Sequence, residues 1–124
     1  MSDRSPAEKA HVKPGATVAV LNPVPGVVEA VGLPDGVTFV DPAEAQLVFL
    51  IVRDRDELRT MMPDAVSAMG PASALWVFFR KGSGAAGLDM SRNDVWAVAE
   101  TLDLRPLGLV SVDETWTAFR LKRG

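Results

Sequence analysis

A small group of polar residues could hold a ligand, because each follows an apolar run that is typical of a β-strand. They are Asn22, Asp41, Arg80, Lys81 and Ser83. A carboxylate such as Asp41 can accept hydrogen bonds from sugar hydroxyls, whereas the residues at 80–83 offer the positive charge and donors that an anionic group needs. The stretch RKGSG is not a P-loop, since its lysine precedes the glycines.

The loop after the first apolar run lacks the donors of a nucleotide-binding loop. In VAVLNPVPGV, residues 18–27, only Gly26 remains of the several glycines that such loops use, and Pro23 and Pro25 have no backbone N–H. We therefore interpret this stretch as a rigid turn. The competing interpretation of Asp41 is a helix N-cap before Pro42, and that of residues 80–87 is a flexible loop.

Other polar residues are explained by local structure. His11 is the only histidine and stands in a polar stretch, too isolated for a triad or a metal site. Asp113 and Glu114 are adjacent on an extended chain, so their side chains point to opposite faces and do not form a carboxylate pair. We expect a hairpin turn there, with Trp116 packed behind it.

The composition indicates one soluble globular domain. The chain has 124 residues, of which 48% are hydrophobic and 23% charged, and it has no cysteine, which excludes disulfides and thiolate zinc sites. A net charge of −3 does not favour nucleic acid. No apolar run is long enough for a membrane span or a signal peptide, so we expect a cytoplasmic protein. Residues 1–13 are predicted to be a flexible polar tail, and residues 14–124 a single domain.

Strands and helices alternate along the chain until a final pair of strands. We predict strands at 16–21, 37–40, 46–52, 74–79, 107–113 and 115–122, and helical segments at 27–32, after Asp41, at 53–70 and at 92–102. Pro63 should kink or split the third helix. The last two strands are too close together for a parallel return, so they form an antiparallel hairpin. The alternation predicts an α/β fold with a doubly wound, mostly parallel sheet and helices on both faces.

Three stretches resemble a family of small uncharacterised bacterial proteins with a shortened class I S-adenosylmethionine-dependent methyltransferase-like fold. They are KPGATVAVLNPVPG at the start, ALWVFFRKGSG in the middle and LRPLGLVSVDETWTAFRL at the end. This resemblance implies a three-layer Rossmann-like domain with six strands in the order 2-1-3-4-6-5. The family commonly has a Pro-Lys-Lys-type run after the fourth strand, where this chain has Arg80 and Lys81.

The loss of donors from the first loop leads us to expect a non-catalytic domain, not an enzyme, that acts by binding or assembly and has no cofactor and no metal. The alternative is a reduced enzyme or a small-molecule or nucleotide-binding protein that uses the loops after strands 1, 2 and 4. We expect an unknown protein or small-molecule partner, no membrane, and a monomer or weak homodimer. Arg120 and Lys122 are expected to discourage pairing at a sheet edge.

Overall fold

Six strands form one mixed sheet in the computed structural model, which describes residues 5–80 and 92–123. The strands are β1 (Thr17–Leu21), β2 (Thr38–Phe39), β3 (Leu47–Ile51), β4 (Ala74–Arg80), β5 (Leu104–Ser111) and β6 (Trp116–Arg123). Their order is β2-β1-β3-β4-β6-β5, with the first four parallel and β6 antiparallel to both of its neighbours. The predicted fold class and strand order are confirmed.

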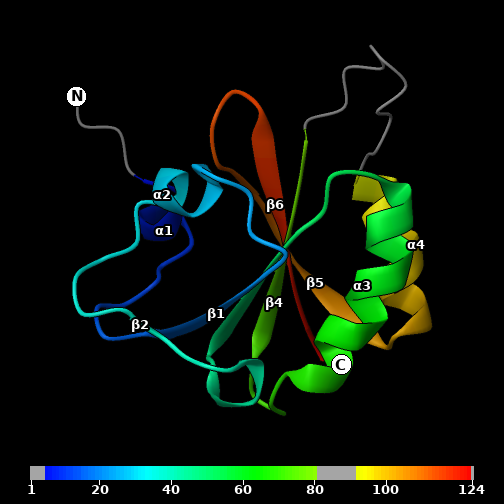
Figure 1. The fold of residues 1–124 in the computed structure, drawn as a ribbon, viewed down its shortest axis with the longest axis horizontal. Helices are drawn as coiled ribbons and strands as arrows, with labels where there is room; N and C mark the ends of the chain where they lie inside the picture. Colours follow the sequence, from blue (N-terminus) through cyan, green and yellow to red (C-terminus); the bar gives the residue numbers. More distant parts are fainter. Residues whose placement is uncertain (1–4, 81–91, 124) are drawn as a thin grey trace.

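Helices cover both faces of this sheet (Figure 1). The helical segments are α1 (Pro6–Lys9), α2 (Val27–Val31), the 3-10 turn η1 (Pro42–Glu44), α3 (Arg55–Ala68) and α4 (Arg92–Thr101). Figure 1 shows α1 and α2 on one side of the sheet and α3 and α4 on the other. We call these two sides the α1/α2 face and the α3/α4 face. Among the described residues, no helix is long and apolar enough to cross a membrane.

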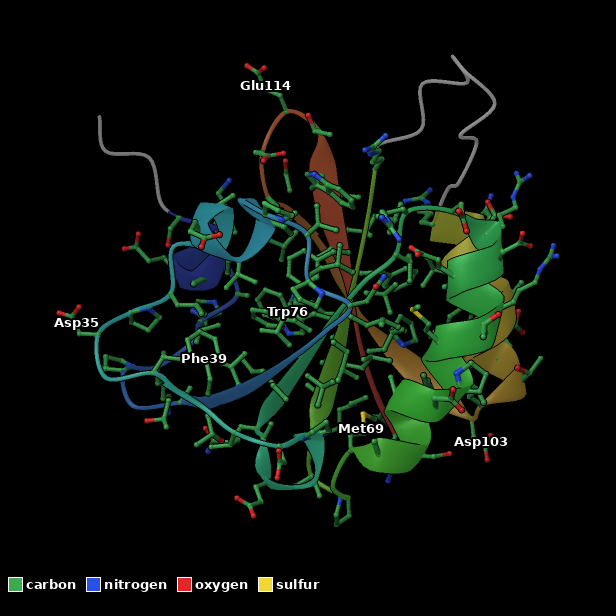
Figure 2. All side chains as sticks on the ribbon, in the orientation of Figure 1. Asp35, Phe39, Met69, Trp76, Asp103 and Glu114 are labelled. Carbon is green, nitrogen blue, oxygen red and sulfur yellow. The ribbon has the colours of Figure 1, made fainter. Side chains whose placement is uncertain are left out.

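The core consists of two apolar clusters, one on each face. Phe49, Trp76 and Phe78 form the centre of the cluster on the α1/α2 face, and the ring of Phe49 lies 5.0 Å from each of the other two. Figure 2 shows Trp76 on this side of the sheet. The other cluster joins the sheet to Leu58 and Met62 of α3. Both clusters follow from the continuous apolar runs of β3 and β4, because a parallel strand covered by helices is buried on both faces.

Helix α3 has a side-chain N-cap at its start and continues through an internal proline. The Asp54 carboxylate accepts a hydrogen bond of 2.9 Å from the Glu57 backbone N–H, as an N-cap does. The helix is continuous through Pro63, so the predicted split does not occur. Leu58 and Ala65 are buried on either side of the proline, and their packing against the sheet compensates for the missing backbone hydrogen bond.

The predicted flexible tail is wrong for residues 5–13. The Ser5 hydroxyl accepts from the Glu8 backbone N–H at 3.1 Å, and the Glu8 carboxylate accepts from the Ser5 N–H at 2.9 Å. This capping box starts α1, whose Ala7 is fully buried in the α1/α2 cluster. The polar composition of residues 1–13 led us to expect no helix here, although α1 packs on the sheet through Ala7.

The C-terminal hairpin forms as predicted. The Asp113 carboxylate accepts from the backbone N–H groups of Thr115 and Trp116 at 2.8 and 2.7 Å, which closes the turn and leaves Trp116 only 6% exposed. Because β6 lies between β4 and β5, Arg120 and Lys122 do not protect a sheet edge, and that expectation is wrong. The edge strands are β2 and β5.

Candidate functional site

The carboxyl ends of β1, β3 and β4 lie along one edge of the sheet, because these strands are parallel neighbours. In Figure 1, β4 runs toward the top of the picture. In open α/β sheets, ligands bind along this edge where the strand order changes direction. Here β1 is followed by β2 on one side, while β3 lies on its other side, so the change occurs between β1 and β3. We call this place the switch point and consider the carboxyl edge the candidate site.

Asn22 bridges the switch point. It follows β1 with a left-handed backbone (φ 55°), a conformation that asparagine tolerates better than most residues. Its side-chain N–H groups donate to the Ile51 carbonyl at 2.7 Å and to the Glu57 carboxylate at 3.2 Å. The amide that we expected to be available for a ligand therefore ties β1 to β3 and α3.

Glu57 lies at this edge beside Asn22 and was not among the predicted site residues. Its carboxylate accepts from the Arg53 backbone N–H at 2.7 Å and pairs with the Arg53 guanidinium at 2.7 Å. These bonds, the guanidinium bond first, outweigh desolvation and lower the pKa of Glu57 below its ordinary value. Glu57 is thus held as a charged acceptor by groups of the protein itself. The sequence contained a signal for this pair, since Arg53 and Glu57 are opposite charges four residues apart, although Arg53 lies just before the N-cap of α3.

The loop after Asn22 is the stiff turn that the prolines predict. The Val27 N–H donates to the Val24 carbonyl at 3.2 Å, with Pro25 and a left-handed Gly26 (φ 86°) in between, which is the signature of a type II turn. Neither proline has an N–H, and that of Val27 is already used. The loop therefore does not fit the glycine-rich, donor-rich loop with which doubly wound α/β folds bind a pyrophosphate.

The structure separates Asp41 from Asn22. Strand β2 has only two residues and pairs with Thr17 and Val18 at the start of β1, and the Val40 N–H donates to the Val18 carbonyl. In this register Asp41 is level with Val20, two residues or roughly 7 Å short of Asn22 along the strand direction. It occupies the N-cap position of η1, as one interpretation predicted, but its exposed carboxylate makes no capping hydrogen bond.

Arg80 ends β4 at the carboxyl edge and is exposed. Its guanidinium carbon lies 5.6 Å from the ring centre of Trp116, its partner across the β4–β6 ladder. The contact is a cation–π interaction, which limits the orientations of the guanidinium. Lys81 and Ser83 lie outside the described residues. Within the described ranges, no group of three or more acidic or histidine side chains could hold a metal ion.

The chain is similar in structure to methyltransferases. No family model matches it, and no curated protein matches its sequence. A ribosomal protein L11 methylase from Lactobacillus delbrueckii superposes with a TM-score of 0.60 at 10% identity, over 95% of this chain and 74% of that one. The M1A22 tRNA methyltransferase TrmK of B. subtilis gives 0.57 at 10% identity, over 100% of this chain and 67% of that one.

A third match is an O-methyltransferase family 2 protein from Planctomyces limnophilus in complex with apigenin, with a TM-score of 0.60 at 13% identity. The match covers 97% of this chain and 56% of that chain, so this chain spans little more than half of it. Identities this low show the methyltransferase-like fold. They also correct one expectation: the chain was predicted not to be an enzyme, but these neighbours of the same fold are named as methyltransferases.

Proposed function

We propose that the chain is a reduced enzyme of the methyltransferase-like fold, which binds a small anionic molecule of nucleotide type at the carboxyl edge of its sheet. The observation that supports this most is the exposed guanidinium of Arg80 beside Trp116 at the end of β4. An arginine offers a planar set of N–H donors that matches a phosphate or carboxylate. Stacking on the indole reduces the side-chain entropy that a ligand would otherwise have to remove.

Trp116 is itself well fixed, which makes the arginine a prepared binding group. The indole is buried in the α1/α2 cluster, and its backbone N–H is bonded to Asp113 in the hairpin turn. Arg80 faces the same side of the sheet as Trp116, since the two residues are paired. The anionic group of the ligand would therefore bind on the α1/α2 side of the carboxyl edge.

The other candidate residues receive different roles in this proposal. Asn22 is a positioning residue, because its amide is used within the protein. Asp41 has no part in this site: it lies three strands from Arg80, about 14 Å across the sheet at the usual strand spacing of about 4.8 Å. A ribose held at one end of a mononucleotide would not reach it.

The test compares AMP with adenosine by calorimetric titration, since the pair differs only in the phosphate. We expect AMP to bind at least about tenfold more tightly, as a charge-assisted hydrogen bond is worth roughly 1.5–3 kcal/mol. Arg80→Gln should remove this difference. Arg59→Gln, an exposed arginine of α3 on the other face, should preserve it, and so should Asp41→Asn.

Two results would count against the proposal. One is an Arg80→Gln protein that still prefers AMP over adenosine by the full factor. The other is S-adenosylmethionine binding a hundredfold more tightly than AMP, because that would require the donors that the turn at 23–27 lacks.

A further inference from the structure

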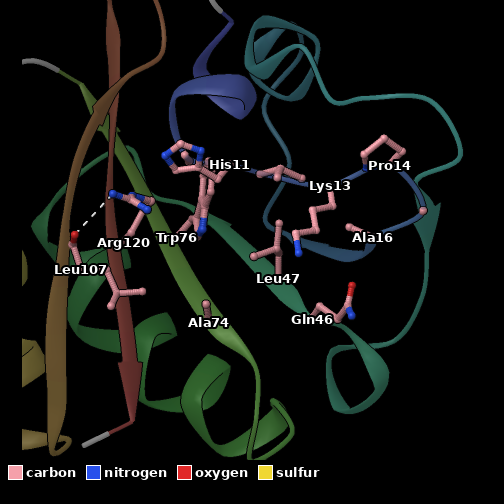
Figure 3. Close-up of a pocket in the computed structure, with 13 residues that line it drawn as sticks. His11, Lys13, Pro14, Ala16, Gln46, Leu47, Ala74, Trp76, Leu107 and Arg120 are labelled. Atoms are coloured by element: carbon pink, nitrogen blue, oxygen red, sulfur yellow. Dashed lines mark hydrogen bonds between the residues drawn. The ribbon is translucent and has the colours of Figure 1, made fainter.

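We infer that a second ligand site lies on the α1/α2 face, in a cavity beside Trp76 that would bind a small organic anion with an apolar body. The cavity has a volume of about 410 Å³, within the range of small-molecule sites. It lies where the segment after α1 passes the first residues of β3 and β4, beside β5 and β6 (Figure 3). It is thus near the amino ends of the parallel strands, opposite the carboxyl edge.

The cavity wall is positive although the chain is negative. Lys13 and Arg120 line the cavity together with His11, and no aspartate or glutamate is among the lining residues in the described part of the chain. The whole chain has a net charge of −3. Two permanent cations without an acidic neighbour in the wall produce a positive local potential, which favours an anionic ligand.

Arg120 is only partly satisfied by the protein. It lies on β6 opposite Trp76, and one terminal nitrogen donates to the Leu107 carbonyl at 3.3 Å. Its Nε is shielded from solvent and has no hydrogen-bond partner in the described part of the chain. A buried N–H without an acceptor is unfavourable by roughly 1–3 kcal/mol. A carboxylate in the cavity would supply acceptors to this edge of the guanidinium after a small rotation of its plane.

A bulge in β5 holds the guanidinium in place. The ladder between β5 and β6 shifts register between Pro106 and Gly108, and Gly108 adopts a φ of 129°. A Cβ at Gly108 would lie only 3.2 Å from the Arg120 Nη2. The glycine therefore provides the space that the guanidinium occupies, and the bulge presents the Leu107 carbonyl to it. Bulges often re-aim side chains in this way near binding sites.

The part of the cavity wall that comes from the segment after α1 includes His11, whose backbone is strained. His11 ends α1 with a left-handed backbone (φ 61°), where its N–H donates to the Glu8 carbonyl and the Val12 N–H to the Ala7 carbonyl. Glycine usually occupies this position of a helix end, and another residue there is unfavourable by about 1 kcal/mol or more. The turn directs the chain so that His11 and Lys13 both line the cavity.

The floor of the cavity is apolar and includes Trp76 and Leu47 (Figure 3). Trp76 is only 2% exposed, so most of the apolar surface open to a ligand comes from other lining residues such as Leu47, Val12 and Leu107. An inorganic ion would leave this surface uncovered, whereas a flat aromatic carboxylate would cover it and place its charge near Arg120. Small-molecule sites are usually lined mainly by apolar side chains, with a few polar groups that fix the orientation of the ligand. Naphthoate, a naphthalene ring with one carboxylate, has both features and is the probe that we choose.

The experiment is a titration of the full chain with naphthoate, followed by heteronuclear NMR of backbone, indole and arginine N–H signals. We expect saturable shifts at the Arg120 Nε–H and the Trp76 indole N–H. The neutral analogue naphthalenemethanol and the ringless anion acetate should each bind at least about tenfold more weakly. Arg120→Gln should weaken naphthoate binding about ten- to a hundredfold, while Arg59→Gln should change it less than about twofold.

Lys13→Gln completes the test. It removes the second cation without touching the sheet and should weaken binding severalfold. Equal affinity of naphthoate and naphthalenemethanol would overturn the inference, as would an equal loss in the Arg120 and Arg59 variants or shifts confined to residues away from the cavity.

Discussion

The carboxyl edge and the cavity beside Trp76 differ in how the protein uses their polar groups. At the switch point, Asn22 and Glu57 bond to each other and to backbone groups of β3 and its loop. In the cavity, within residues 5–80 and 92–123, Arg120 donates one hydrogen bond and keeps a buried N–H without an acceptor, and no acidic residue lines the wall beside Lys13. At the switch point the polar groups are bonded within the protein, whereas in the cavity an arginine N–H is left without an acceptor among the described residues. Arg80, the exposed arginine of the proposed ligand site, lies at the end of β4 and not at the switch point.

The contrast between the switch point and the cavity predicts how each region contributes to stability. Groups that are already bonded stabilise the fold, and replacing them should reduce stability. Groups that are left unsatisfied reduce stability and are typically retained at functional sites. Replacing Asn22 or Glu57 should therefore lower the free energy of unfolding, whereas replacing the guanidinium of Arg120 should not.

The largest effect is expected from Asn22→Asp at the switch point. The aspartate would place a second carboxylate near Glu57 and would have no N–H for the Ile51 carbonyl. We expect a loss of about 3 kcal/mol in the free energy of unfolding, measured by urea denaturation. Asn22→Gly keeps the left-handed backbone but lacks the amide, and it should lose less. Equal stability of Asn22→Asp and the parent chain would show that the bridge contributes nothing.

Gly108→Ala should lower both the free energy of unfolding and the affinity of the cavity for naphthoate. Its φ of 129° disfavours alanine, and the added methyl would displace the Arg120 guanidinium. We expect a loss of about 1–2 kcal/mol and a fall in naphthoate affinity. The matched control is Gly26→Ala, which has a positive φ of 86° but open space around it, and it should lose stability without losing affinity.

Glu57→Gln tests the charge at the carboxyl edge through its pH dependence. The folded-state pKa of Glu57 is lowered, so its contribution to stability is present above the unfolded value of about 4.3 and is lost as the pH falls through the folded value. We expect Glu57→Gln to be less stable by about 1 kcal/mol at pH 7 and to match the parent at strongly acid pH. Glu29→Gln on α2 is the control, and its free energy of unfolding should equal that of the parent chain at both pH values.

The smallest expected effect has the opposite sign. Arg120→Met keeps much of the side-chain volume and removes the buried N–H that lacks a partner. The free energy of unfolding should stay equal or rise by up to about 1 kcal/mol, while naphthoate binding is lost. A loss of more than about 2 kcal/mol would mean that Arg120 is mainly structural.

The sequence predicted the sheet well because its signals are local. The apolar runs of β3 and β4, the prolines of the first turn and Asp113 of the hairpin each act within a few residues. The S-x-x-E spacing of Ser5 and Glu8 is also a local signal, typical of a capping box at the start of α1. We did not predict this helix because the composition of residues 1–13 is polar.

The candidate site was harder to predict because it depends on register. The position of Asp41 follows from the pairing of a two-residue strand with the start of β1, and nothing near Asp41 encodes that pairing. Arg120 meets Trp76 because β6 returns antiparallel to β4, across more than forty residues of sequence. The cavity arises from this long-range pairing together with the turn at His11.

The most direct test of the contrast follows two side-chain N–H signals in one naphthoate titration, the Asn22 amide and the Arg120 Nε–H. The account predicts that the Arg120 signal shifts to saturation and exchanges more slowly with solvent, while the Asn22 signal stays unchanged. A titration in which Asn22 shifts and Arg120 does not would contradict it, because the ligand would then bind at the switch point and not in the cavity.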